Sequence, residues 1–197
     1  MNERSVFAIL AAAAALSLAA CSPTSGDSPP LQGATIGGPF TLTDQDGKRV
    51  SDRDFAGKYR LVYFGFTYCP DVCPVDLQLI GQGLRQFEKE DPARAAKLQP
   101  IFITVDPERD SPAVMKQYVA AFHPRLIGLT GSPEEIAAVV KRFGAYHMKG
   151  EVDDAGGYSV DHARTALLFG PQGEPIAIVP HDQGPGAVAA ELERWVK

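Results

Sequence analysis

Residues 63–74 have the sequence YFGFTYCPDVCP, and this stretch decides the fold class. Its first half is apolar and aromatic, which predicts a buried strand ending near Cys69. Pro74 is expected to be the first residue of a helix, a position that suits proline. Because a residue before proline avoids the helical region, Cys69 and Cys73 should be extended or in a turn. Two thiols are therefore predicted at a strand-to-helix corner, where helix N–H groups favour thiolate. Such a pair can close a disulfide or bind a soft metal ion.

Predicted strands and helices alternate along the rest of the chain. A hairpin with an Asp-Gly turn is expected at 40–50, and buried strands at 59–66, 98–105 and 125–130. Helices are expected at 74–90, 112–122, 133–143 and 187–196, with a second hairpin at 165–179. Residues 145–158 are polar and predict an inserted loop or ribbon. This order predicts an α/β fold with helices on both faces of the sheet. It is a thioredoxin-like arrangement, with an N-terminal β-hairpin extension and an inserted loop before the segment that carries His162.

Length and composition indicate one globular domain with an appendage. The chain has 197 residues, with 45% hydrophobic and 22% charged residues, which is ordinary for a globular protein. We expect the domain to span residues 36–197, long enough to bury roughly two-thirds of its unfolded surface without a disulfide staple. The formal net charge of -5 and the lack of a basic cluster in the sequence argue against nucleic-acid binding.

The N-terminus has the pattern of a targeting segment. An apolar run at 6–20 is too short for a comfortable membrane span and is typical of a signal peptide, predicted here at residues 1–20. Its end, Leu18-Ala19-Ala20-Cys21, resembles a bacterial lipobox, in which Cys21 becomes the lipidated first residue. An uncleaved anchor helix is the alternative. Residues 21–35 are rich in Pro, Gly and Ser and predict a flexible tether. Both interpretations place the domain on the extracytoplasmic, periplasmic side of a membrane, where disulfides are permitted.

Three segments together point to a family. GFTYCPDVCP at 65–74, VDPERDSP at 105–112 and VDH at 160–162 closely resemble the signatures of the Sco (SenC-type) copper-binding proteins of cytochrome c oxidase assembly. They occur in the family's order and spacing, and the resemblance covers about residues 36–197. The chain departs from the family at Ala163, where many relatives have Ser or Thr, and in its predicted lipid anchor, where the family usually has a transmembrane one. The resemblance implies a copper site, with Cu(I) or Cu(II) as the ion.

The cysteine pair alone leaves several chemistries open. Three residues separate Cys69 from Cys73, a wider loop than in CxxC redox enzymes. A disulfide needs alpha carbons within about 7 Å, whereas soft thiolates select Cu(I) or zinc. Structural zinc normally has four ligands, and no obvious fourth is present in the sequence. In a thioredoxin-like fold the loop that carries His162 faces the cysteine corner, and the family resemblance assigns the metal-binding histidine to this residue. A histidine that caps a strand end is the alternative.

The other polar residues near these motifs have weaker claims. We interpret His123, His147 and His181 as structural or exposed histidines. Asp71 and Asp161 are candidates for supporting the ligands, although Asp71 is equally well explained as a turn-forming residue. The 106–110 loop follows a buried strand and could border the site, but we prefer a solvated loop that caps the helix at Ser111.

The aromatic residues around the cysteines have a simpler explanation than a cofactor cage. We expect core or near-site packing for Tyr63, Phe64, Phe66 and Tyr68.

Two functions compete. The first is a copper metallochaperone that delivers its ion to the dinuclear copper site of an oxidase subunit and needs no catalysis. The second is a thiol–disulfide oxidoreductase in which Cys69 or Cys73 attacks a partner disulfide and the other resolves it. Another copper chaperone or a thioredoxin-like reductant would be a further partner. A peroxidase is disfavoured because Phe66 stands where peroxide-reducing relatives place Thr, and a purely structural disulfide is disfavoured by the size of the domain.

Overall fold

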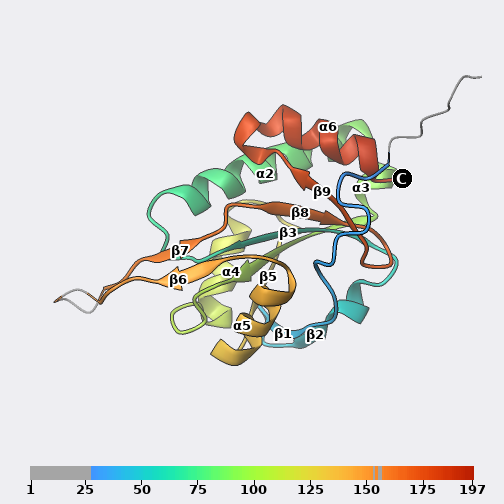
Figure 1. Cartoon of the computed structure of the whole chain (residues 1–197). Coiled ribbons are helices and arrows are strands. Elements are labelled where there is room, and N and C mark those ends of the chain that lie inside the picture. Colours follow the sequence, from blue (N-terminus) through green and yellow to red (C-terminus); the bar gives the residue numbers. More distant parts are fainter. Residues whose placement is uncertain (1–27, 153, 155–156) are drawn as a thin grey trace, which may run out of the picture.

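The computed structural model describes residues 28–152, 154 and 157–197 (Figure 1). A seven-stranded mixed sheet has the order β2-β1-β5-β4-β3-β8-β9, and a separate two-stranded ribbon pairs β6 with β7. The strands are β1 (Thr41–Asp44), β2 (Arg49–Ser51), β3 (Tyr59–Gly65), β4 (Leu98–Thr104), β5 (Ile127–Thr130), β6 (His147–Lys149), β7 (Val160–His162), β8 (Ala166–Phe169) and β9 (Pro175–Val179). The helices are α2 (Val72–Glu90), α3 (Pro92–Ala95), α4 (Pro112–Ala120), α5 (Pro133–Arg142) and α6 (Pro185–Trp195), with short 3-10 turns η2 (Asp52–Phe55) and η3 (His181–Gln183).

β3 is an interior strand of the sheet, between β4 and β8, and it positions the site. It pairs in parallel with β4 from Tyr59↔Leu98 to Gly65↔Thr104, and antiparallel with β8. Its residues after Tyr59 are all buried, as expected for a strand covered on both faces. Since β3 and β4 run in the same direction, the loops that follow them leave the sheet at the same end, next to the carboxyl ends of both strands. These loops carry the cysteines and the 106–110 turn.

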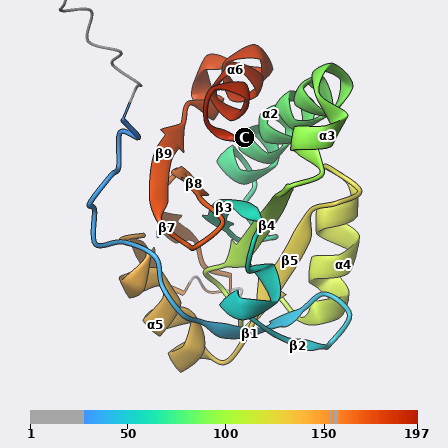
Figure 2. The same cartoon turned by 90° about the vertical axis from the view of Figure 1, so that its right-hand side faces the viewer.

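Helices cover both faces of the sheet, as the alternating pattern predicts (Figure 2). On one face, α2, α4 and α6 pack over a core that includes Phe87, Phe102 and Leu192. On the other, α5 and the N-terminal segment cover Phe64 and Leu129. The thioredoxin-like fold and its N-terminal hairpin extension are therefore confirmed, with Gly47 at the hairpin turn in the left-handed region (φ +80°).

The helix after β3 differs from the prediction. It begins at Val72 and not at Pro74, so Cys73 is helical rather than extended. Proline is tolerated here because the N–H groups of the first turn have no intrahelical partner, and Pro74 therefore removes no helix hydrogen bond. The short helix α3 and the turns η2 and η3 were not predicted, since none has enough residues to show a periodic pattern.

The chain enters the domain along the edge of β9. Within the segment expected to be a tether, the Leu31 N–H donates to the Ile176 carbonyl at 2.9 Å. The predicted signal peptide and Cys21 lie outside the described residues. Among the helices of the described part of the chain, none has the length and apolar character needed to cross a membrane.

Candidate metal centre

The two cysteines lie at the corner between β3 and α2, one on each side of the helix start. Cys69 is partly buried in the connecting loop, and Cys73 is fully buried in the first turn of α2. Both thiols are free. The backbone N–H of Cys73 donates to Cys69 Sγ at 3.4 Å. The sulfur of Cys69 therefore accepts a hydrogen bond at the N-terminus of α2.

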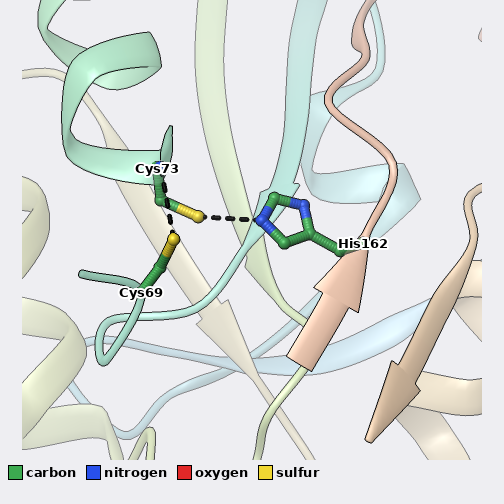
Figure 3. Close-up of side chains that lie close together, drawn as sticks. All are labelled: Cys69, Cys73 and His162. Atoms are coloured by element: carbon green, nitrogen blue, oxygen red, sulfur yellow. Dashed lines mark hydrogen bonds between the residues drawn. The ribbon is translucent and has the colours of Figure 1, made fainter. Parts of the chain in front are cut away.

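His162 reaches this corner from the end of β7 (Figure 3). Its Nε2 lies 3.0 Å from Cys73 Sγ, although 89 residues separate the two in sequence. Its Nδ1 lies 3.0 Å from the Ala163 carbonyl oxygen, which fits an Nδ1–H donor and leaves the Nε2 lone pair facing the sulfurs. A backbone carbonyl that orients the distal nitrogen is the usual arrangement at metal-binding histidines.

The three side chains form one compact cluster. The two sulfurs and a ring nitrogen of His162 all lie within 4.8 Å of one another. Within residues 28–152, 154 and 157–197, it is the one group of at least three Cys, His, Asp or Glu side chains with this closeness. The rings of Tyr63 and Phe66 meet the His162 ring edge-on, at 6.3 and 5.9 Å between centroids. Packing against two aromatic rings restricts the orientation of the imidazole.

Burial keeps Cys73 and His162 uncharged. It raises the pKa of the Cys73 thiol well above its usual range. Burial also lowers the pKa of His162, against the opposing hydrogen bond to Ala163. At neutral pH, Cys73 is therefore a thiol and His162 a neutral imidazole. A metal ion that binds here must displace the Cys73 proton.

The remaining predicted residues lie around the cluster or away from it. Asp71 is exposed just before α2, and Asp161 is exposed on β7 opposite Met148. His147 lies directly across the ribbon from His162 in register. His123 is buried elsewhere, 3.3 Å from a Glu88 oxygen, which supports a structural role.

The prediction of a solvated loop at 106–110 is wrong in part. Ser111 does cap α4, accepting from the Val114 N–H at 3.4 Å. However, Asp106 and Asp110 are buried. Asp110 accepts hydrogen bonds from the Thr67 N–H (3.0 Å) and hydroxyl (2.6 Å), and so supports the start of the cysteine loop. A buried strand end favours such an inward acid, because its neighbouring backbone and hydroxyl groups need partners.

The aromatic residues around the cysteines differ in burial. Tyr63, Phe64 and Phe66 are buried, as expected, but Tyr68 is 57% exposed beside Cys69. Tyr68 lies in the turn beyond the end of β3, where the chain leaves the core, and its ring packs near the site, 5.0 Å from the Arg109 guanidinium carbon.

A buried carboxylate beneath the site forms an ion pair that the sequence did not predict. Asp76, one turn after Cys73 on α2, is fully buried and accepts two bonds from Arg164, at 2.6 and 2.9 Å. It also accepts from the Tyr63 hydroxyl at 2.7 Å, and His181 Nε2 lies 3.3 Å away. Since Arg164 follows His162 by two residues, this pair ties the histidine segment to the cysteine helix. The detectable signal was an Asp at a core-facing helix position, three residues after Cys73.

The comparisons with known proteins agree with this geometry. The SCO1/SenC family model matches residues 28–197. The chain belongs to the SCO1/SenC family. The resemblance predicted from the three segments is thus confirmed.

Individual relatives are similar over most of the domain. The mitochondrial SCO2 homolog of Bos taurus is 46% identical over 144 residues, which are 73% of this chain and 53% of that protein. This chain therefore spans about half the length of the curated relatives that it matches. The structure of Bradyrhizobium japonicum ScoI with copper bound is 44% identical, covering 81% of this chain and 99% of that one, with a TM-score of 0.73. Yeast Sco1 with copper bound is 34% identical, covering 82% and 88%, with a TM-score of 0.74.

Proposed function

We propose that this protein is a copper metallochaperone. It binds Cu(I) or Cu(II) through Cys69, Cys73 and His162 and delivers the ion to the dinuclear copper site of cytochrome c oxidase. The observation that carries the proposal is the cluster of two sulfurs and one imidazole nitrogen within 4.8 Å. The copper-bound structures of similar proteins support it.

The donor set fits copper. Two thiolates are soft ligands that suit Cu(I), and imidazole suits both oxidation states. A structural zinc site normally has four closed ligands, whereas this cluster supplies three. When bound, the ion would be held between the cysteine corner and the ribbon, with the buried Cys73 on its inner side.

The unequal exposure of the two cysteines suggests the order of transfer. Cys73 is fully buried, whereas Cys69 is partly exposed on its loop. An acceptor thiolate would therefore approach from the Cys69 side. Ligand exchange would replace Cys69 first, and the buried Cys73 and His162 would be released last.

The test compares variants of the proposed ligands with a control variant on the same ribbon. His162→Ala and the double variant Cys69→Ala/Cys73→Ala are titrated anaerobically with copper, following thiolate-to-Cu(II) charge transfer. His147→Ala is the control, because it removes the histidine directly opposite His162 on the ribbon. We expect both site variants to lose stoichiometric binding and oxidase assembly, and the control to keep them. Stoichiometric copper binding by the double cysteine variant would refute the proposal.

A thiol–disulfide oxidoreductase is the second candidate, favoured by the 3.4 Å bond from the Cys73 N–H to Cys69 Sγ. The Cys69 thiolate would attack a partner disulfide, forming a mixed disulfide and releasing one partner thiolate. Cys73 would then lose its proton and attack Cys69, releasing the second partner thiol. The partner gains two electrons, and this chain is left with a disulfide that a thioredoxin-like reductant must reduce. Dithiol exchange that survives in His162→Ala, with copper binding and assembly intact, would select this activity.

We propose that the domain works on the extracytoplasmic, periplasmic side of a membrane, with a lipid on Cys21 as its anchor. The lipobox-like sequence before Cys21 supports this placement. Radiolabelled palmitate should enter the wild-type protein and not Cys21→Ala. Equal labelling of both proteins would contradict lipidation at this residue.

A further inference from the structure

Arg109 lies where the three segments of the metal centre meet. It follows β4 in the turn that carries Asp106. Its guanidinium carbon is 3.6 Å from the centroid of the Tyr158 ring on the approach to β7. It is also 5.0 Å from the Tyr68 ring and 5.6 Å from the Phe66 ring, both in the cysteine loop. One cation therefore contacts aromatic rings from the cysteine side and from the histidine side.

Hydrogen bonds and ion pairs reinforce these stacked contacts. Arg109 Nη1 donates to the Tyr158 carbonyl at 3.1 Å, and Nε pairs with the buried Asp106 carboxylate. The Tyr158 hydroxyl donates to Asp106 at 2.8 Å. Above the same ring, Lys149 Nζ lies 4.0 Å from the centroid and 2.6 Å from a Glu108 oxygen. The turn after β4 thus holds both strands of the ribbon.

The ribbon depends on such contacts for its position. β6 and β7 pair over three residues each and form a sheet of their own, outside the seven-stranded one. An isolated two-stranded hairpin is marginally stable at best in water. The Asp76–Arg164 pair fixes the chain beyond His162. The contacts of Arg109 fix the chain before it, through Tyr158.

We propose that Arg109 is a positioning residue of the metal centre, which holds the β6–β7 ribbon against the cysteine loop and so sets the approach of His162 to the two sulfurs. Phe66 is a second connection, because its ring centroid lies 5.6 Å from the Arg109 guanidinium carbon and 5.9 Å from the centroid of the His162 ring. The inference rests on the proposed copper function, and it adds a residue other than the three proposed ligands.

An arginine is suited to this position in a way that a lysine is not. Its planar guanidinium can stack on one ring while its N–H groups bond to Asp106 and to the Tyr158 carbonyl. A lysine keeps the charge but loses the stacked plane and one of the two bonds. Arg109→Lys therefore isolates geometry from charge.

The experiment uses Arg109→Lys, with Arg49→Lys as the matched control. Arg49 lies on β2, away from the cluster, and its side chain also pairs with a carboxylate, that of Glu135. We expect Arg109→Lys to lower Cu(II) affinity roughly tenfold, as for other residues that orient metal ligands. The charge-transfer and nitrogen hyperfine signals should also change. The Arg49→Lys control should match the wild type in Cu(II) affinity, in the charge-transfer signal and in the nitrogen hyperfine signal.

A readout without copper tests the same idea. The Gly150 N–H donates to the Ser159 carbonyl and the Ala163 N–H donates to the Tyr146 carbonyl, both at 2.9 Å and at opposite ends of the ribbon. Both amides should exchange with deuterium faster in Arg109→Lys, while amides of β3 and β4 exchange at the wild-type rate. A residue with a merely structural role would lower the melting temperature and leave the copper spectrum unchanged.

The outcomes separate this inference from the proposed function. If Arg109→Lys binds Cu(II) with wild-type affinity and spectrum while His162→Ala does not, the positioning role is refuted and the copper function stands. If His162→Ala also binds normally, the proposed function fails. Should Arg109→Lys not fold, Tyr158→Leu removes the partner ring and must show the same loss. Normal copper binding by a folded Tyr158→Leu would equally refute the role of the stack.

Discussion

Replacing Asp76, which lies beneath the metal centre, with Asn should lower the free energy of unfolding of the domain. The carboxylate is fully buried and accepts three hydrogen bonds within 2.9 Å, two from Arg164 and one from Tyr63. A hydrogen bond to a charged group contributes about 1.5–3 kcal/mol, but the Arg164 side chain is 47% exposed and regains water. We therefore expect a loss of about 2–3 kcal/mol in the free energy of unfolding. For a domain of this size it corresponds to a fall of about 5–10 °C in melting temperature.

The loss should depend on pH with a definite sign. Burial alone would raise the pKa of Asp76, but the hydrogen bonds from Arg164 and Tyr63 outweigh it and hold the pKa below its usual value. A carboxyl whose folded-state pKa is lowered stabilises the fold above its unfolded pKa of about 3.9, and this stabilisation disappears as the pH falls through the lower folded value. The difference between wild type and Asp76→Asn should thus be full at pH 7 and shrink below about pH 4.

Urea unfolding at pH 7 and pH 3, followed by circular dichroism, measures both effects. Glu135→Gln is a suitable control, because it breaks an arginine–carboxylate pair at a more exposed position, where such pairs contribute about 0–1 kcal/mol. A loss below about 0.5 kcal/mol for Asp76→Asn at pH 7 would show that the buried pair does not stabilise the fold. A difference that grows toward acid pH would contradict the assigned charge state.

Three further predictions concern the cluster itself. Apparent copper affinity should rise with pH, about tenfold per unit for each proton displaced, because the raised pKa keeps Cys73 protonated at neutral pH; a flat profile from pH 6 to 8 in competition titrations would contradict this. Gly65→Ala would place a Cβ 2.8 Å from Cys73 Sγ and 2.9 Å from the Phe102 ring. Copper affinity should therefore fall, and the free energy of unfolding should drop by about 1–3 kcal/mol. Wild-type values in calorimetry and copper titration would show that the sulfur moves aside freely. Iodoacetamide should modify Cys69 before the buried Cys73, as followed by peptide mass spectrometry, and equal rates would show that α2 opens readily.

The fold was accessible from the sequence because its signals are local. Apolar runs define β3 and β4, and Ser-Pro pairs start α4 and α5 as N-cap and first residue. The predicted start of α2 was two residues too late, since Pro74 is compatible with several positions in the first turn of a helix. Local patterns therefore establish which elements exist better than where they begin.

The site was only partly accessible, because its most important contacts are distant in sequence. The cysteine pair is visible as a motif, and His162 was found through the topology and the family resemblance. The Arg164–Asp76 pair spans 88 residues and the Arg109–Tyr158 contact 49, and no sequence spacing records either. Such partners become visible only when the chain is folded, since burial selects which charges must be paired.

The place where the chain enters the domain has a consequence for its orientation. The first described residues lie at the opposite end of the molecule from the β6–β7 ribbon and the start of α2 (Figure 1). If the preceding segment is anchored in a bilayer, as we propose, the metal centre lies at the end of the domain away from the attachment point. The domain would then present its cargo at a distance from the membrane set by its own long dimension plus the tether.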